Sequence, residues 1–478
     1  MVDVLESADR AVGDCLAAIV KAHHRRRLKR LGWLGALDPP AGGWADGDPA
    51  PRGGNDLEVL VDGAEALPRI AEAIERARSY VWLAGWFFSP SFSLGGDGGR
   101  TLRELLAETA RRVDVRVLGW AGAPLPLFHP DRAEVRKTRD ELVRGTRIQF
   151  ALDARERPLH CHHEKLGIVD GETAFVGGID LTTLGGNRLD TNNHPQRRGI
   201  GWHDATTRLR GPAVTDVADH FRLRWLEVTG EPLPADGTAQ KAGELEVQVV
   251  RTVPERIYDA LPRGDFRVAE SYLRALRSAE RLVYLENQFL WSPEIVAVLA
   301  EKLRNPPADE FRLVLVLPAK PKNGAEDTRG QLGVLVNADD GGGRLLACTL
   351  HQRGERAEPV YVHAKIGIVD DRWLTLGSAN LNEHSLFNDT EMNVVVRDEA
   401  LARRTRLRLW AEHLDCAPDE LQANPAEILE GRWRPLAEEQ RRRREAGLPL
   451  AHRLLLLEHV SRRAAGMLGP LNGFLVDG

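Results

Sequence analysis

Two copies of one short pattern hold the residues in this sequence that are best suited to chemistry. Residues 163–170 read HEKLGIVD and residues 363–370 read HAKIGIVD, so both have the form HxKxxxxD, 200 residues apart. A neutral imidazole is a nucleophile, and an ammonium group beside it offsets the charge of a phosphate, so each copy suits attack on a phosphodiester. A second imidazole is needed to protonate the departing alcohol and then to activate an acceptor. The duplication supplies both imidazoles.

The repeated pattern contains six candidate catalytic residues: His163, Lys165, Asp170, His363, Lys365 and Asp370. In an extended strand alternate side chains share a face, so the His and Lys of each copy are expected to point the same way, about 7 Å apart. Asp170 and Asp370 stand where the strands end, and we expect them to accept hydrogen bonds from turn amides or from the opposing half. If the two strand faces turn toward each other, they build one site rather than two.

A carboxylate follows each histidine at a similar distance along the chain. Asp190 lies 27 residues after His163, and Glu391 lies 28 residues after His363. A carboxylate that accepts a hydrogen bond from the far ring nitrogen fixes the imidazole tautomer and stabilises the charged ring. We therefore expect Asp190 and Glu391 each to orient one imidazole.

The elements that must position these residues also occur twice. Each half is expected to run from a helix, with apolar residues three and four apart, into a buried strand and then a second strand. The helices are expected over residues 69–78 and 269–281, and the strands over 80–88, 113–118, 282–290 and 312–317. The period is far longer than that of a solenoid. The sequence therefore predicts an α/β fold of two similar mixed-sheet domains, with helices on both faces, a pseudo-two-fold axis and one shared active site.

A stretch that contains glycine and proline, residues 229–244, separates the two repeats and is expected to hold the linker. The expected domains are a partly helical N-terminal extension over 1–50, a first repeat over 51–235, a linker over 236–244, a second repeat over 245–415 and a C-terminal helical extension over 416–478.

Composition limits the classes of protein to which the chain can belong. Of its 478 residues, 42% are hydrophobic and 28% are charged, which is typical of a globular protein and argues against a fibre or wholesale disorder. The net charge of −5 gives no general attraction for nucleic acid. The apolar runs are too short to span a bilayer, acidic residues interrupt the first twenty positions, and the four cysteines form no CxxC pair. We therefore expect a cytoplasmic protein that binds no nucleic acid.

Together with the residues that follow them, the two motifs resemble the phospholipase D superfamily. After the motifs come GGID at residues 177–180, GSAN at residues 377–380, and then Glu391. Further similarity, to the eukaryotic and plant-type phospholipases D, lies in residues 188–191 (RLDT), 201–204 (GWHD) and 285–289 (LENQF). The resemblance covers roughly residues 57–414. It implies a phosphodiesterase that hydrolyses a phospholipid to phosphatidate and a headgroup alcohol, with transfer to other alcohols.

The resemblance also implies a role for individual residues. His163 would form a phosphohistidine, and His363 would act first as acid and then as base. The phosphate ligands would be Lys165, Lys365, Ser378 and Asn380. The residues expected near the substrate pocket are Asp180, Trp86, Glu286 and Gln288. No metal and no other cofactor is expected.

The first half departs from the second, because Gly178 and Asp180 stand where Ser378 and Asn380 do. A carboxylate cannot donate a hydrogen bond to phosphate as an amide can. The plant-type pattern itself has an acid at this position.

Several alternatives remain open. A nuclease of the same superfamily is expected to show a basic groove, and a phosphatidyltransferase similar to cardiolipin synthase is expected to carry amino-terminal membrane helices. An inactive lipid-binding scaffold would keep the fold without the chemistry. A zinc site at residues 160–163 (HCHH) is not favoured, because adjacent strand residues cannot all converge on one ion and the sequence shows no partner cluster.

Two basic clusters, residues 23–30 and 441–444, are either solvated helix faces or contacts with an anionic membrane. A phospholipid substrate lies in such a membrane. Solvated faces are the default interpretation, and peripheral contact with the inner face of the membrane is the alternative. We expect a monomer.

Overall fold

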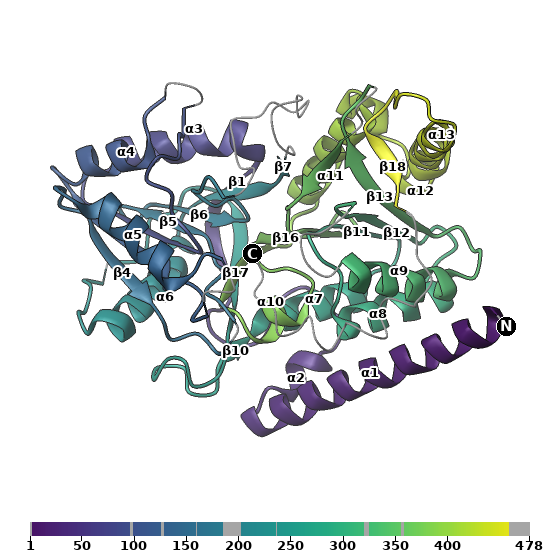
Figure 1. Ribbon diagram of the computed structural model, residues 1–478, viewed down its shortest axis with the longest axis horizontal. Helices are drawn as coiled ribbons and strands as arrows, with labels where there is room; N and C mark the ends of the chain where they lie inside the picture. Colours follow the sequence, from purple (N-terminus) through teal and green to yellow (C-terminus); the bar gives the residue numbers. More distant parts are fainter. Residues whose placement is uncertain are drawn as a thin grey trace.

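The computed structural model describes residues 2–95, 99–125, 129–158, 160–184, 202–235, 237–319, 325–354 and 358–457. Two α/β halves lie side by side, and the N-terminal helix α1 (Val2–Leu31, purple) runs along the edge of the second half (Figure 1). Within the described residues, no helix combines the length and the apolar character that crossing a membrane requires.

The described strands of the first half form one mixed sheet in the order β4-β3-β2-β5-β6-β8-β1. Their bounds are β1 (Arg52–Val61), β2 (Tyr80–Gly85), β3 (Asp114–Trp120), β4 (Gln149–Asp153), β5 (Leu166–Val169), β6 (Thr173–Gly177) and β8 (Ala205–Arg210). The pairs β2–β3 and β3–β4 are parallel, and the other pairs are antiparallel. The helices of this half are α3 (Asp62–Glu75), α4 (Leu102–Thr109), α5 (Arg132–Val143) and α6 (Val214–Thr229).

The second half repeats this arrangement, in the order β18-β13-β12-β11-β15-β16-β17-β9. Its strands are β9 (Leu245–Val253), β10 (Asp265–Phe266), β11 (Leu282–Glu286), β12 (Arg312–Val316), β13 (Leu345–His351), β14 (Pro359–Val362), β15 (Ile366–Val369), β16 (Trp373–Gly377), β17 (Glu391–Val396) and β18 (Leu454–Leu456). Its helices include α7 (Arg267–Ser278), α8 (Pro293–Arg304), α9 (Ala325–Asp339), α10 (Glu383–Phe387) and α11 (Glu399–Leu414). The parallel strands β11, β12 and β13 correspond to β2, β3 and β4, and the hairpin β15–β16 corresponds to β5–β6.

Helices cover both faces of each half because the central strands are apolar on both faces. In β2, Val81 and Leu83 pack with α3 and α4, whereas Trp82 and Ala84 pack on the other face with α6. Burial on both faces needs an uninterrupted apolar strand, which is what the sequence provides here. The two-domain mixed α/β fold predicted from the internal repeat is therefore confirmed.

The two halves are joined through their sheets and through one core. Strand β1 pairs with β8 of its own half and, at Arg52 and Asn55, with β9 of the second half. A single buried apolar cluster contains Trp82 and Phe221 of the first half together with Val394 and Trp410 of the second. The relative position of the halves, on which any shared site depends, is thus held by close-packed side chains.

Some elements differ from those expected. Helix α3 begins at Asp62 and ends at Glu75, and α7 ends at Ser278, so both helices end before the predicted limits. Residues 454–456, expected within a helical extension, form strand β18 and pair with β13. Before β18, the chain forms the short segments η1 (Pro418–Leu421), α12 (Pro425–Ile428) and η2 (Leu429–Trp433) and then helix α13 (Arg434–Glu445). Between α6 and β9 the described residues form neither helix nor strand, as expected of a linker.

Candidate active site

The two HxK segments lie in extended chain immediately before β5 and β15, rather than inside these strands as expected. Each segment is bonded to the opposite half. The amide of His163 donates to the carbonyl of Thr390 at 3.0 Å, and the amide of His363 donates to the carbonyl of His203 at 2.8 Å. His203 ends the short strand β7 (Trp202–His203), which pairs with β14 in parallel. These backbone bonds set the two imidazoles at the boundary between the halves.

Each imidazole meets a carboxylate that comes from the other half. Nδ1 of His163 lies 2.9 Å from Oε1 of Glu391, and Nδ1 of His363 lies 2.7 Å from Oδ2 of Asp204. All four side chains are buried. Because Nδ1 of each ring meets a carboxylate, Nε2 is the ring atom suited to act as nucleophile, acid or base. The two contacts repeat each other in opposite directions.

The register of the sheets makes Asp204 the counterpart of Glu391. The amide of Gly178 donates to the carbonyl of Ala205 at 2.9 Å, and the amide of Ser378 donates to the carbonyl of Met392 at 3.0 Å. Asp204 and Glu391 directly precede those two carbonyl residues. The pseudo-two-fold relation therefore extends to the carboxylates.

The carboxylate assignments made from chain distance need correction. Glu391 orients the imidazole of the first half, His163, and not that of its own half. Asp190, expected to orient His163, lies outside the described residues, and Asp204 was missed. The signal for Asp204 was its position directly before an alternating strand, residues 205–210, just as Glu391 opens β17.

Burial shapes the proton affinity of both carboxylates. It raises the pKa of Glu391 well above its usual range, although Lys165 and the hydroxyls of Ser378 and Ser385 oppose the shift. Burial also raises the pKa of Asp204 to about 7, against the charge of Lys365 and a hydrogen bond from the Ala205 amide. Each carboxyl must be ionised to accept an imidazole N–H, and the lysines and the hydrogen-bond donors named here favour that ionised form against the effect of burial.

Each lysine donates to the backbone carbonyl of the histidine two residues before it, but the side-chain partners of the two lysines differ. Nζ of Lys165 lies 3.0 Å from Oδ2 of Asp180. Nζ of Lys365 donates to Oε1 of Gln288 at 3.1 Å, and the side-chain amide nitrogen of Asn380 donates to the same oxygen at 3.3 Å. The lysine of the first half thus faces an acid, and that of the second half faces neutral amides.

The charges of both lysines act on one carboxyl, that of Asp204. The charges of both Lys365 and Lys165 lower the pKa of Asp204, which holds His363. Lys165 of the first half therefore acts on the carboxylate that orients the imidazole of the second-half motif. Both motif segments, each with its imidazole and its lysine, thus lie where the two halves meet.

The serine after the second motif has a different place from the one implied by resemblance. Ser378, expected at the phosphate, donates its hydroxyl to Glu391, and Ser385 donates to the other oxygen of the same carboxylate. Asn380 stays beside Lys365 through their shared contact with Gln288. Two hydroxyls thus fix the carboxylate that orients His163.

The aspartates that close the two motifs lie away from the imidazoles. Asp170 accepts hydrogen bonds from the amides of Arg78, Ser79 and Tyr80, where β2 begins. Asp370 accepts from the amides of Glu280, Arg281 and Leu282, where β11 begins. Both contacts agree with the turn-bonding role expected of these side chains, and they place Asp170 and Asp370 outside the reacting centre.

The four residues expected near the pocket divide into two groups. Asp180 and Gln288 contact the lysines directly. Glu286 is fully buried and bridges His203 and His413, each at 2.7 Å, so it supports β7, whose last residue precedes Asp204. Trp86 packs in a separate apolar cluster with Phe87 and Trp120.

Further side chains beside the site were not found from the sequence. The rings of Trp202 and Tyr361 lie 4.5 and 6.3 Å from that of His363, centroid to centroid. A mostly apolar pocket reaches Lys165 and Asp180 and is lined also by Leu83, Phe88 and Ile179. Aromatic rings thus stand beside His363, and apolar side chains of the first half stand beside Lys165 and Asp180.

Comparisons with known proteins agree with this geometry. A family model described as "Cardiolipin synthase, PLD-like domain" matches residues 272–411. Phospholipase D A of Dictyostelium discoideum is 26% identical over 466 residues, covering 76% of this chain and 36% of that protein. Phospholipase D alpha 4 of Arabidopsis thaliana is 24% identical, covering 76% of this chain and 65% of the relative. The major cardiolipin synthase ClsA of Bacillus subtilis is also 24% identical, covering 73% and 67%.

The chain thus spans between about a third and two thirds of the length of these relatives. Among solved structures, the phosphatidylserine synthase of Haemophilus influenzae Rd KW20 matches with a TM-score of 0.50 and 14% identity. The match covers 87% of this chain and 97% of that structure, which shows a shared fold. The duplicated motif, the fold and the relatives together support membership of this chain in the phospholipase D superfamily.

Proposed function

We propose that this protein is a phospholipase D-type phosphodiesterase that cleaves a phospholipid to phosphatidate and a headgroup alcohol. The observation that carries the proposal is the reciprocal anchoring of His163 by Glu391 and of His363 by Asp204 across the two halves. The names of the relatives, phospholipases D and a cardiolipin synthase, support a phospholipid as substrate.

The first step is a transfer of the phosphatidyl group to the protein. Nε2 of His163 attacks phosphorus, a P–N bond forms, and the bond between phosphorus and the headgroup oxygen breaks. His363 gives its Nε2 proton to that oxygen, so the alcohol leaves neutral. Glu391 keeps the ring of His163 in the tautomer whose Nε2 carries the lone pair.

The second step returns both rings to their initial state. His363, now neutral, takes a proton from a water molecule, whose oxygen attacks phosphorus and breaks the P–N bond. Phosphatidate leaves, and His163 is again a neutral imidazole. Two inversions retain the configuration at phosphorus.

The lysines and Asn380 supply the groups that hold the phosphate. Non-bridging oxygens of the phosphate would replace Asp180 as partner of Lys165, and Gln288 as partner of Lys365 and Asn380. Positive charge fixed around these oxygens stabilises the transition state more than the ground state. Because Asp180 offsets the charge of Lys165, the second half contributes the larger share of this binding.

A second candidate function is phosphatidyl transfer, in which an alcohol takes the place of water. The chemistry at both imidazoles is unchanged, since His363 deprotonates an alcohol as readily as it does water. The matched family model and the Bacillus subtilis relative, both described as cardiolipin synthases, favour this candidate. Supply of an acceptor alcohol decides between the two outcomes.

We also propose cytoplasmic action at an anionic membrane surface. Arg25 and Arg27 of the first basic cluster pair with Asp38 and Glu255. The exposed cations that remain candidates for headgroup contact in this cluster are Arg26, Lys29 and Arg30. Each basic residue near such a surface contributes about 1 kcal/mol of attraction.

The proposal is tested with vesicles of phosphatidylcholine and of phosphatidylglycerol. We expect headgroup release by the wild type and no release by His163→Ala, whereas His129→Ala, which changes an exposed histidine, keeps full activity. Added glycerol separates hydrolysis from transfer, because transfer to glycerol yields a glycerophospholipid in place of phosphatidate. Equal release by the wild type and His163→Ala would contradict the proposal.

A further inference from the structure

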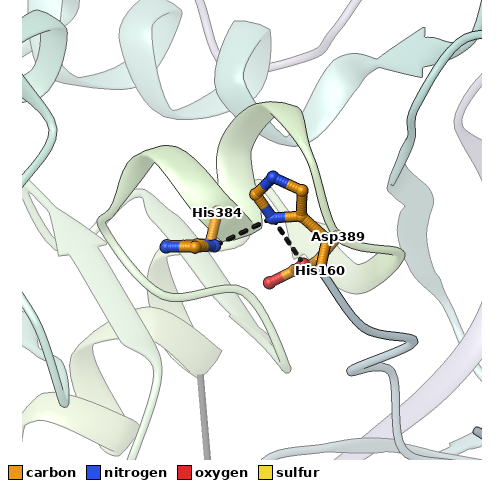
Figure 2. A group of neighbouring side chains, drawn as sticks. All are labelled: His160, His384 and Asp389. Carbon is orange, nitrogen blue, oxygen red and sulfur yellow. Dashed lines mark hydrogen bonds and ion pairs between the residues drawn. The ribbon is translucent and has the colours of Figure 1, made fainter. Parts of the chain in front are cut away.

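A second cluster of histidine and carboxylate side chains lies next to the proposed active site but takes no part in it. Nδ1 of His160 lies 2.9 Å from Nδ1 of His384 and 3.3 Å from Oδ1 of Asp389. His160 precedes the first HxK motif, His384 belongs to α10 and Asp389 follows that helix, so the cluster joins the two halves. Figure 2 shows the three side chains with their nitrogen and oxygen atoms turned toward one another.

Two of the three side chains in the cluster are buried, and the third, His160, is partly exposed to solvent. Asp389 is fully buried, and His384 is 1% exposed. The His160 side chain is 11% exposed, which gives a route from solvent. Of the other groups of this kind in the described residues, that of His203, Glu286 and His413 is fully buried, whereas that of Asp62, His203 and Glu412 is partly exposed at Glu412.

Hydrogen bonds alone leave one polar atom of the cluster without a partner. Oδ1 of Asp389 accepts a hydrogen bond from the amide of Cys161 at 2.9 Å. Its other oxygen, Oδ2, is buried, and among the described residues it has no hydrogen-bond partner. A buried carboxylate oxygen without a partner is costly, and a bound cation would compensate its charge.

Two imidazole nitrogens and a carboxylate oxygen form a ligand set suited to a divalent transition ion, above all zinc. Zinc binds such atoms at about 2.0–2.2 Å, so its tetrahedral ligands lie about 3.3 Å from one another. The separations of 2.9 and 3.3 Å in this cluster are close to that spacing. All three ligand atoms lie within 4.8 Å of one another. Small rotations of the rings therefore admit the ion.

We propose that His160, His384 and Asp389 bind one zinc ion, with a water molecule as fourth ligand on the exposed side of His160. The ion holds together the two segments that position His163. His162 and Thr390 form a bridge between the halves, and the amide of Thr390 donates to the carbonyl of Cys161 at 3.2 Å. The ligands lie beside this contact in both segments. The ion therefore stabilises the interface between the halves and does not touch the substrate.

This site could not be predicted from the sequence, because its ligands come from distant segments. Residues 160–163 offer histidines that cannot all converge, and only folding brings His384 and Asp389 to His160. The ligands also stand in the two segments that carry His163 and Glu391. Zinc at this position would tighten the contact between the imidazole and its carboxylate.

The test is a titration of chelator-treated protein with zinc chloride, in competition with a chromophoric chelator. We expect the wild type to bind one equivalent, and both His160→Ala and Asp389→Asn to bind that equivalent at least tenfold more weakly. His129→Ala, which alters an exposed histidine paired with Glu134 at 2.8 Å, is the matched control and should keep wild-type affinity. Zinc should raise the Tm of the wild type and of this control only.

Each variant is first compared with the wild type by thermal unfolding in chelator, which shows that it folds without the ion. Loss of the zinc equivalent in both ligand variants supports the site. The site is refuted if the wild type binds no saturable equivalent, if either ligand variant keeps wild-type affinity, or if His129→Ala loses it as well. These readouts measure the metal alone, so they are independent of the proposed catalytic activity.

Discussion

Oε1 of Glu391 in the second half lies 2.9 Å from Nδ1 of His163 in the first, and Asp204 and His363 repeat this contact in the opposite direction at 2.7 Å. Neither half holds an oriented imidazole by itself. Each half contains one motif imidazole and also the carboxylate that contacts the imidazole of the other half. Docking of the halves and assembly of the site are therefore one event, and the shared apolar core that fixes the docking also fixes the catalytic geometry.

The contact between Glu391 and His163 predicts a defect in catalysis with little defect in binding. In Glu391→Gln, the amide cannot hold the ring tautomer in the same way or balance charge that develops on the ring. We expect kcat to fall by roughly 10²–10⁴-fold with KM nearly unchanged. Steady-state headgroup release measures both constants. Glu439→Gln, which alters an exposed ion pair with Arg442, is the control and should keep the wild-type kcat. A kcat of Glu391→Gln within threefold of the wild type would contradict the role of Glu391 in orienting His163.

The contact between Asp204 and His363 predicts a defect that depends on the leaving group. His363 is proposed to protonate the departing alcohol, so weakening its carboxylate partner matters most when that alcohol is a poor leaving group. In Asp204→Asn, we expect a large loss of rate with a choline headgroup and a clearly smaller loss with a p-nitrophenyl phosphodiester. The ratio of the two rates, compared with that of the wild type, is the measurement. An equal loss on both substrates would exclude an acid role for His363 in the first step.

Much of the fold was predictable, because apolar periodicity and an exact internal repeat report on local structure. The two HxKxxxxD motifs gave the imidazoles and lysines, and the apolar strands gave the mixed sheets. The pairing across the halves was not predictable, since Glu391 is nearest in sequence to His363 but meets His163 in space. The same holds for Asp204 and for the ligands of the proposed zinc site. Contacts of this kind are set by how the halves dock, which no local pattern encodes.

The raised pKa of Asp204 predicts how stability depends on pH. Burial raises this pKa from 3.8 to about 7, so between these values the folded protein keeps a proton that the unfolded chain releases. This carboxyl therefore makes the free energy of unfolding decrease as the pH rises from about 4 to 7. In Asp204→Asn that contribution is absent, and we expect a flatter pH dependence over this range. Denaturant unfolding of both proteins at several pH values measures the difference, and parallel curves would show that the carboxyl does not titrate in this way.

The contacts of the last aspartate of each motif predict that its substitution lowers the stability of the fold but leaves catalytic activity nearly unchanged. Asp370 accepts hydrogen bonds from three consecutive amides at the start of β11, at 2.7–2.8 Å, and has φ of 53°. Asn tolerates this left-handed conformation but carries no charge and one acceptor fewer. We expect Asp370→Asn to destabilise the fold by roughly 1–3 kcal/mol, while kcat stays within about threefold of the wild type.

Asp340→Asn is the matched control for Asp370→Asn, because Asp340 is exposed and also has positive φ, at 45°. It should leave both the free energy of unfolding and kcat unchanged. A large loss of kcat in Asp370→Asn at a temperature where the variant is fully folded would mean that Asp370 contributes to the chemistry. Retained activity with reduced stability would place the last residue of the motif among the groups that hold β11, and hence Gln288 and Lys365, in position.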